Sequence, residues 1–123
     1  MIQHTTHINI ADNSGAVTVK IIKMLQGNSK AFPAYGAIGV SSIKLIDNPL
    51  ITKVKKGQVH KIMLMRQKRP IKRLDGSLLA FDSSAALLLN SDLAPIASRF
   101  SGPLPREIKD LDPQILAIST KFF

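Results

Sequence analysis

The sequence contains no cysteine and no tryptophan, and acidic residues are scarce in it. Without cysteine, disulfide bonds and thiolate metal sites are excluded. One Tyr and five Phe argue against a platform of aromatic side chains for stacking single-stranded bases. No uninterrupted apolar run reaches the ~18 residues of a membrane-spanning helix. The first ten residues resemble neither a secretory signal nor an organellar presequence, so we expect no targeting segment in the chain as given.

The charge balance is strongly positive. Against eight acids stand 17 Lys and Arg residues, which gives a net charge of +9 and an isoelectric point of about 10.2. At 123 residues and 45% hydrophobic content, we expect one globular domain spanning residues 1–123. Such a charge points to a polyanionic partner. The alternative is an ordinary solvated basic surface, which the clustering of the cations disfavours.

The cations concentrate in one stretch. Nine of the 17 lie within residues 53–73, where no acid occurs. Apolar residues alternate along 58–67, which is the two-residue period of a strand. Asp75-Gly76 then predicts a hairpin, because glycine tolerates the positive φ of primed turns, and a return strand begins at 78–81. We therefore expect a β-ribbon with a basic tip.

Further strands are predicted on both sides of this ribbon. The last of them, 85–89, is continuously apolar, as expected for a strand buried on both faces. Five or more short strands in a domain of this size indicate a mainly β fold with a small closed or nearly closed barrel. The strand ranges predicted from alternation and from turn residues are 5–10, 16–25, 38–46, 58–67, 78–81 and 85–89.

The C-terminal segment, about 103–123, has a different character. The polar run 106–110 predicts a short helix, and Asp112-Pro113 offers an N-cap followed by proline at the first helical position. The apolar residues expected to dock this second helix on the barrel are Ile115, Leu116 and Ile118.

No catalytic or metal-binding constellation is found. His4 and His7 point to opposite faces if they lie in one strand. The aspartates at 12, 75 and 82 neighbour turn residues, where bonding to the local backbone explains them better than acid–base work. Ser14 has no evident His partner. We expect no enzymatic activity, no metal and no cofactor.

Several short motifs, each of them weak alone, occur in a specific order and spacing along the chain. Together they are highly specific, and the whole chain resembles the universal L-fourteen family of large-subunit ribosomal proteins. The motifs are Met1-Ile2-Gln3, Ala11-Asp12-Asn13-Ser14-Gly15-Ala16, Ile22-Lys23, Lys53-Val54-Lys55-Lys56-Gly57, Asp75-Gly76-Ser77, Phe81-Asp82, Leu88-Leu89-Asn90, Pro95-Ile96, Arg99, Gly102-Pro103 and Arg106-Glu107.

The resemblance implies a five-stranded barrel with a projecting β-ribbon and two small C-terminal helices. It implies binding of large-subunit rRNA at the intersubunit face, contacts with ribosomal proteins L-three and L-nineteen, and a bridge to the rRNA of the small subunit. A ribosome-silencing factor docks on the C-terminal loop region of bacterial and organellar members. By position, the residues of that docking region are Ser98, Arg99 and Arg106.

Physical chemistry supports the RNA assignment independently. Each Lys or Arg that meets a phosphate releases condensed counterions, so affinity accumulates with contacts and falls with salt. Double-stranded RNA, read by shape and phosphates, suits a basic ribbon with few aromatics. The residues predicted to contact RNA are Asn13, Ser14, Lys23, Lys53, Lys55, Lys56, Arg66, Lys68, Arg69, Lys72 and Arg73.

Some positions depart from the pattern of bacterial members. Val17 and Thr18 stand where two Arg are usual, and Ala31 and Ala80 replace other basic residues. Pro70 stands where glycine is common. The remaining positive charge is therefore concentrated in the ribbon. Such loss of arginines is typical of a mitochondrial ribosomal protein, and a protein of a divergent bacterium is the alternative. A free-standing barrel-type RNA-binding regulatory protein is the alternative function, and an enzyme acting on nucleic acid is third.

Overall fold

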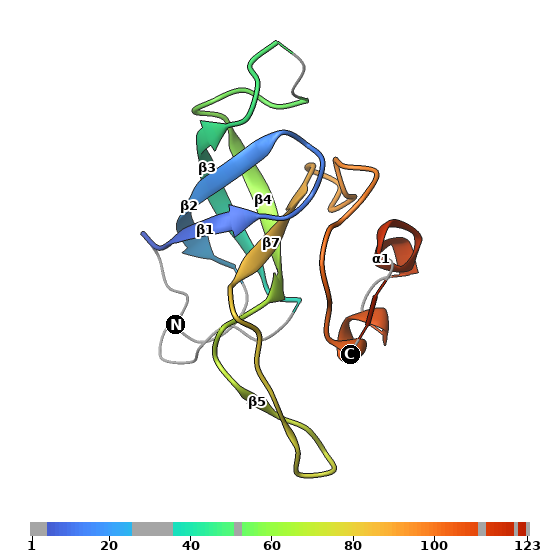
Figure 1. Cartoon of the computed structure of the whole chain (residues 1–123). Helices are drawn as coiled ribbons and strands as arrows, with labels where there is room; N and C mark the ends of the chain where they lie inside the picture. Colours follow the sequence, from blue (N-terminus) through green and yellow to red (C-terminus); the bar gives the residue numbers. More distant parts are fainter. Residues whose placement is uncertain (1–4, 26–35, 51–52, 111–112, 120, 123) are drawn as a thin grey trace.

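Five strands close into a barrel in the computed structural model of the chain (Figure 1). The structure describes residues 5–25, 36–50, 53–110, 113–119 and 121–122. Neighbouring strands are antiparallel, except β1 and β7, which pair in parallel and close the barrel. This confirms the predicted small β-barrel. In order around it, the strands are β1 (His7–Ile10), β2 (Ala16–Met24), β3 (Ile38–Ile46), β4 (Val59–Arg66) and β7 (Ala85–Leu89).

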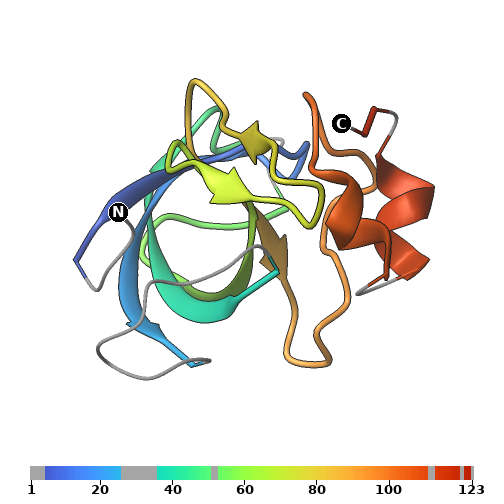
Figure 2. The ribbon, with the colours of Figure 1, turned by 90° about the horizontal axis from the view of Figure 1, so that it is seen from below.

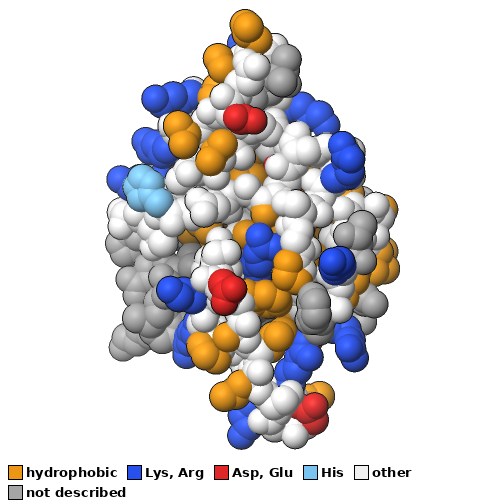
Figure 3. Space-filling view, in the orientation of Figure 1, with side chains coloured by type: hydrophobic (Ala, Val, Ile, Leu, Met, Phe, Trp, Pro, Cys, Tyr) orange, Lys and Arg blue, Asp and Glu red, His pale blue; other side chains and the backbone are white. Residues whose placement is uncertain are grey.

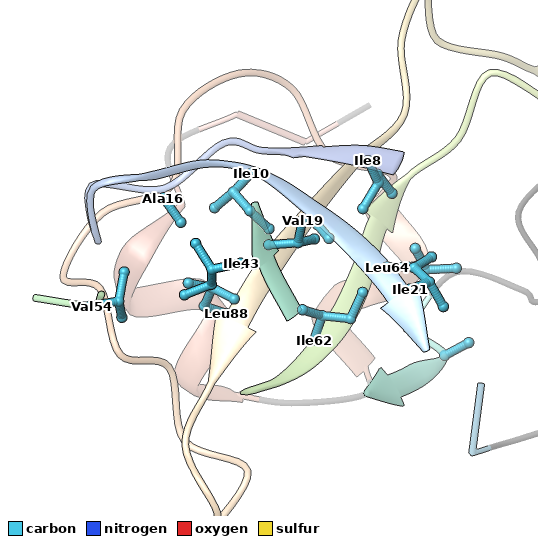
Figure 4. Packing of buried hydrophobic residues seen from close by; sticks show 12 residues of the cluster. Ile8, Ile10, Ala16, Val19, Ile21, Ile43, Val54, Ile62, Leu64 and Leu88 are labelled. Carbon is cyan, nitrogen blue, oxygen red and sulfur yellow. The ribbon is translucent and has the colours of Figure 1, made fainter. Parts of the chain in front are cut away.

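Alternating residues of the strands fill the barrel interior with aliphatic side chains (Figure 4). Burying one such side chain is worth about 1.5–3 kcal/mol, so the alternation fixes which face of each strand points inward. The predicted strand alternation is confirmed for β1, where Ile8 and Ile10 point inward, and in β4 Ile62 and Leu64 do so. Among the strand residues of this interior, those with the least exposure are Ile8, Val19, Ile21, Ile43, Ile62, Leu64, Ala86 and Leu88.

Strand β7 is buried on both faces, as its continuous apolar sequence predicted. Ala86 and Leu88 face the interior, whereas Leu87 and Leu89 belong to a second core outside the barrel. That second core joins the outer faces of β4 and β7 to the C-terminal segment. Its buried members are Met63, Met65, Ala85, Leu87, Leu89, Phe100, Leu104, Ile108 and Ile115.

The C-terminal segment contains one 3-10 turn, η1 (Arg106–Asp110), and one α-helix, α1 (Pro113–Ile118). Both lie beside the barrel rather than across its end (Figure 2). Ile115 is fully buried, but Leu116 is 45% exposed, so its predicted docking was wrong: one turn of helix presents only one side to the barrel. Asp112, the predicted N-cap, lies outside the described residues.

Backbone hydrogen bonds hold the C-terminal segment and the loop before it against the turn between β1 and β2. The amide of Ser101 donates to the carbonyl of Ala11 at 2.7 Å, and the amide of Phe100 donates to the carbonyl of Ile118 at 2.9 Å. Asp12, in the turn after β1, forms an isolated bridge with Phe100. The turn between β1 and β2 therefore lies directly beside the loop before η1.

Some predicted strand boundaries were too generous. Thr5 was assigned to the first strand, but its φ of 67° places it in the left-handed region, and β1 begins at His7. The second and fourth strands each lose one or two terminal residues, as frayed ends do. His4 and the predicted loop around Gly27 lie outside the described residues.

Candidate nucleic-acid interface

A two-stranded ribbon projects from one end of the barrel (Figures 1 and 2). It consists of β5 (Ile71–Lys72) and β6 (Leu78–Leu79), which pair in antiparallel register. The amide of Gly76 donates to the carbonyl of Arg73 at 3.0 Å, and the amide of Arg73 donates to the carbonyl of Ser77 at 2.9 Å. The loop therefore has three residues, and only Gly76 has positive φ, at 90°. The predicted hairpin is confirmed, but its turn is not of the primed type.

Local bonds stiffen this loop. The Oδ1 atom of Asp75 accepts hydrogen bonds from the amide and the hydroxyl of Ser77, at 2.9 and 2.6 Å. These bonds stabilise the ionised carboxylate and lower the pKa of Asp75 below its ordinary value. Asp75 therefore serves the turn, as the sequence predicted.

The tip of the ribbon is less basic than predicted. Leu74 is fully exposed there beside Asp75, and Leu78 is 70% exposed. The cations lie further back, on the incoming arm of the ribbon between residues 66 and 73, whereas the return arm, residues 80–84, contains no Lys or Arg. The alternating pattern and the Asp-Gly pair predict the ribbon from the sequence. Which residues lie at its tip depends on the length of the loop, which is three residues.

Three of the predicted cations are exposed on the incoming arm: Lys68, Arg69 and Lys72. The amide of Lys68 donates to the hydroxyl oxygen of Ser84 at 3.1 Å, and the amide of Phe81 donates to the carbonyl of Gln67 at 3.3 Å. These bonds hold the arms side by side between the barrel and β5. The incoming arm thus presents three exposed positive charges from one ordered backbone.

Arg66 turns toward the protein instead. Its Nη1 atom donates to the carbonyl oxygens of Ser101 and Pro103, at 3.1 and 3.3 Å, and its guanidinium lies over the ring of Phe100. Partial burial lowers the pKa of Arg66 from its ordinary value. The side chain therefore links the end of β4 to the C-terminal segment.

Arg73 also has an intramolecular partner. Its Nε lies 2.9 Å from Oε1 of Glu107 in η1, in an ion pair whose side chains are 23% and 48% exposed. Solvent screens such a pair, so its contribution to stability is small, about 0–1 kcal/mol. Its geometric effect is larger, since it ties the ribbon to the 3-10 turn.

Another group of predicted RNA contacts lies at the opposite end of the barrel from the ribbon, in the loop that leads into β4 (Figure 1). Lys53, Lys55 and Lys56 are exposed there. Gly57, in the turn before β4, has a φ of 85° and donates its amide to the carbonyl of Ile43 at 2.9 Å. The backbone amide of Lys53 donates to the carbonyl of Ser14 at 3.0 Å. The predicted contacts thus fall into two separate groups.

Asn13 and Ser14 have structural partners. The side chain of Ser14 is fully buried, and its hydroxyl donates to Oδ1 of Asp12 at 2.5 Å. Oδ1 of Asn13 accepts bonds from the amides of Ser98 and Arg99, at 3.0 and 3.2 Å. Since the hydroxyl of Ser14 faces inward, it has no access to a phosphate in this conformation. Asn13 is exposed, but its amide group already joins the two loops.

The remaining predicted site residues are exposed. Lys23 lies on the outer face of β2, where it pairs with Val40. Ser98 and Arg99 lie in the loop bound by Asn13, and Arg106 begins η1. In the part of the chain that the structure describes, no cluster of three or more His, Cys, Asp or Glu residues could hold a metal ion. No described helix has the length and hydropathy needed to cross a membrane.

Comparison with known protein families decides between the alternatives. The sequence model of the family described as ribosomal protein L14p/L23e matches residues 1–123, the whole chain. The chain belongs to this family. The resemblance drawn from the short motifs is therefore confirmed.

Members of the L14p/L23e family are structural proteins of the large ribosomal subunit, so this chain is one as well. Its partners are rRNA and other ribosomal proteins, and its place is in a ribosome.

Sequence reasoning missed the partners of the two arginines. Glu107 is 34 residues from Arg73, and Ser101 is 35 residues from Arg66. No local pattern links positions so far apart. The sequence therefore contains no local signal for either contact.

Proposed function

We propose that this L14p/L23e protein binds large-subunit rRNA through two groups of exposed cations, one at each end of the barrel. The observation that carries the proposal is the exposure of Lys68, Arg69 and Lys72 on the ordered incoming arm of the ribbon. Phosphate contacts there release counterions, and the projecting ribbon can follow a groove of helical RNA. The second group comprises Lys53, Lys55 and Lys56, with Lys23 on the wall between the two groups.

Arg66 and Arg73 belong to this proposal only indirectly. Both were predicted as RNA contacts, but each has protein partners that hold the C-terminal segment. Because Arg66 and Arg73 are also partly buried, we assign the direct contacts to the three cations whose side chains are exposed, Lys68, Arg69 and Lys72.

The variant Lys68→Gln/Arg69→Gln/Lys72→Gln tests the proposal. Its salt slope for binding a large-subunit rRNA transcript should flatten by about 0.7–0.9 for each phosphate that is no longer neutralised. A matched control, Lys68→Arg/Arg69→Lys/Lys72→Arg, keeps the charges and should bind like the wild type. An unchanged slope in the Gln variant would remove the ribbon from the RNA interface.

Within the ribosome, we propose the intersubunit face, with ribosomal proteins L-three and L-nineteen as neighbours and a bridge to small-subunit rRNA. The exposed residues Ser98, Arg99 and Arg106 form the proposed docking surface for a ribosome-silencing factor. These assignments rest on the family pattern. Cross-linking from each of the three positions in intact large subunits, followed by mass spectrometry, would identify the actual neighbours.

We propose that the ribosome is mitochondrial, because neutral residues replace usual arginines at Val17, Thr18 and Ala80. Sucrose-gradient sedimentation of separate mitochondrial and cytoplasmic lysates tests this. The chain should co-migrate with mitochondrial large subunits and resist a moderate salt wash. A position at the top of both gradients would instead favour the free-standing RNA-binding protein.

A further inference from the structure

Four lysines share the outer wall of the barrel on three neighbouring strands. In the register of β2, β3 and β4, Lys20 pairs with Ser42, and Ser42 pairs with Val59. In the next row, Lys23 pairs with Val40, and Val40 pairs with Lys61. Directly paired residues of antiparallel strands point to the same side of a sheet. Because Val19, Ile21 and Ile62 point into the barrel, both rows point outward.

A β-bulge adds the fourth lysine. Thr18 pairs with Leu45 and Val19 pairs with Ile43, so Lys44 is the extra residue of β3. Lys44 and Leu45 are both exposed. A second irregularity between Ile21 and Lys23 turns Ile22 outward, where it is 51% exposed. The bulges thus place additional side chains on the outer wall.

This wall carries charge of one sign only. No acidic residue occurs in β2, β3 or β4, and among the described residues no ion pair involves any of the four lysines. Strands lie about 4.8 Å apart, so Lys23 and Lys61, in the same row with one strand between them, have backbones about 10 Å apart. That separation exceeds the Debye length of about 8 Å, so solvent screens most of the repulsion between exposed charges at this distance. The isolated barrel therefore tolerates these lysines without an acid beside them, and they offer a polyanion several points of attraction at once.

The side chains between the lysines indicate which polyanion fits. They are aliphatic or small, namely Ile22, Val40, Ser42 and Val59, and none is aromatic. Stacking of unpaired bases therefore finds no platform on this wall. Lysine acts as a mobile point charge, which suits the phosphate backbone of a helix. Figure 3 shows Lys and Arg side chains along the edge of the molecule where β2 and β3 lie.

We propose that the outer face of β2, β3 and β4 is a second surface for the backbone of helical rRNA, separate from the ribbon. The inference rests on the proposed rRNA-binding function and extends it from Lys23 to the whole wall. The RNA then touches the protein along its side as well as at its two ends. The lysines that neutralise phosphates on this surface are Lys20, Lys23, Lys44 and Lys61.

The test compares four full-length proteins on a transcript of large-subunit rRNA from the same ribosome. They are the wild type, the wall variant with all four lysines changed to Gln, its charge-preserving counterpart with all four changed to Arg, and the ribbon variant described above. The measurements are the salt slope of binding and hydroxyl-radical footprints on the RNA. The wall variant should flatten the slope by about 0.7–0.9 for each of its four lysine–phosphate pairs, roughly three in all. It should lose a footprint that the ribbon variant keeps, and the Arg counterpart should restore it.

Thermal unfolding shows whether the wall variant is folded; relief of repulsion should leave its midpoint equal to or above that of the wild type. If it does not fold, the paired variants Lys20→Gln/Lys44→Gln and Lys23→Gln/Lys61→Gln replace it. A wild-type slope and footprint in the wall variant, beside a flattened slope in the ribbon variant, would overturn the wall surface, Lys23 included, and leave the two groups of cations at the ends of the barrel as the proposed RNA contacts. Normal RNA binding with loss from assembled subunits would mean an acidic protein partner and would also overturn it. Failure of the wild type to bind the transcript would remove both proposals.

Discussion

Arg66 lies over the ring of Phe100, with its guanidinium carbon 5.7 Å from the ring centroid. The same guanidinium donates hydrogen bonds to the carbonyls of Ser101 and Pro103. A residue at the end of β4, where the ribbon begins, thus holds the loop that leads to η1. The ribbon and the C-terminal segment are therefore positioned together, although they are far apart in the chain.

Replacing Arg66 should destabilise the protein. Hydrogen bonds from a charged donor contribute about 1.5–3 kcal/mol, and Arg66→Ala also removes the cation from the ring of Phe100, so we expect a destabilisation of about 2–3 kcal/mol. Arg66→Lys keeps the charge but lacks the planar guanidinium that lies over Phe100 while Nη1 donates to both carbonyls, so it should recover only part of that stability. Denaturant unfolding of the purified chain measures both. The salt slope for RNA should stay at the wild-type value; a decrease of about 0.7–0.9 would mean a phosphate contact instead.

Gly102 should be intolerant of a side chain for two separable reasons. Its φ is 92°, and a Cβ there would collide with Nη1 of Arg66. Gly57→Ala is a matched control, because Gly57 has a φ of 85° and open space around it. Left-handed geometry costs alanine about 1–2 kcal/mol, so Gly57→Ala should show that cost alone and Gly102→Ala should exceed it. In a double-mutant cycle, Arg66→Ala should reduce the excess; strict additivity would show that the two residues do not crowd each other.

The contacts of Arg66 could not be predicted from the sequence, whereas the barrel could. The barrel was predictable because alternating residues such as Ile8 and Ile10, or Ile62 and Leu64, repeat the period of a strand with one buried face. The continuous run 85–89 likewise predicted a strand between two cores. Such periodicity involves residues that are neighbours in the chain, so it can be read from the sequence alone. It identifies the strands without saying which charged residue meets which partner.

The candidate site shows the consequence. From composition, Arg66, Lys68 and Arg73 were equivalent cations in one basic run, yet only Lys68 is exposed and the other two contact the C-terminal segment. Asn13 appeared in a motif that resemblance linked to RNA, but its side chain bonds a loop 85 residues away. Long-range pairing depends on how the barrel closes, so only the folded chain could separate contacts with RNA from internal ones.

Removing the partner of Arg73 should strengthen RNA binding. In Glu107→Gln, the guanidinium of Arg73 loses the carboxylate of Glu107 and its charge is less compensated, so the salt slope should steepen by up to about 0.7–0.9 if it then meets a phosphate. Stability should change by less than about 1 kcal/mol, since the pair is exposed to solvent. Asp92→Asn removes the same charge in the loop after β7 and controls for net charge. Equal effects of the two variants would show that release of Arg73 contributes nothing specific.

Asn13 should control the order of the proposed docking loop. Asn13→Ala removes the acceptor of the Ser98 and Arg99 amides, so these amides should exchange with solvent faster by hydrogen-exchange measurements. Each exposed bond contributes about 0.5–1.5 kcal/mol, so the global stability should fall only modestly. Asn48→Ala is the control, because the side chain of Asn48 accepts a bond from the Leu50 amide within its own loop. Unchanged exchange at Ser98 and Arg99 would mean that other contacts fix the loop.

The tip of the ribbon should respond to acid only below the ordinary range of aspartate. Bonds from Ser77 lower the pKa of Asp75 in the folded hairpin, so their contribution is fully present above the unfolded pKa of about 3.9 and is lost as the pH falls through the lower, folded value. Between pH 5 and 8 the loop should therefore be insensitive to pH. A carboxyl titration by NMR should find the pKa of Asp75 below the usual aspartate value.

The variant Ser77→Ala should raise that pKa toward the ordinary value, because both the hydroxyl bond and the ordered loop are weakened. Ser83→Ala, in the exposed stretch before β7, should leave it unchanged. An Asp75 that titrates alike in all three proteins would show that the turn is not held by these bonds in solution.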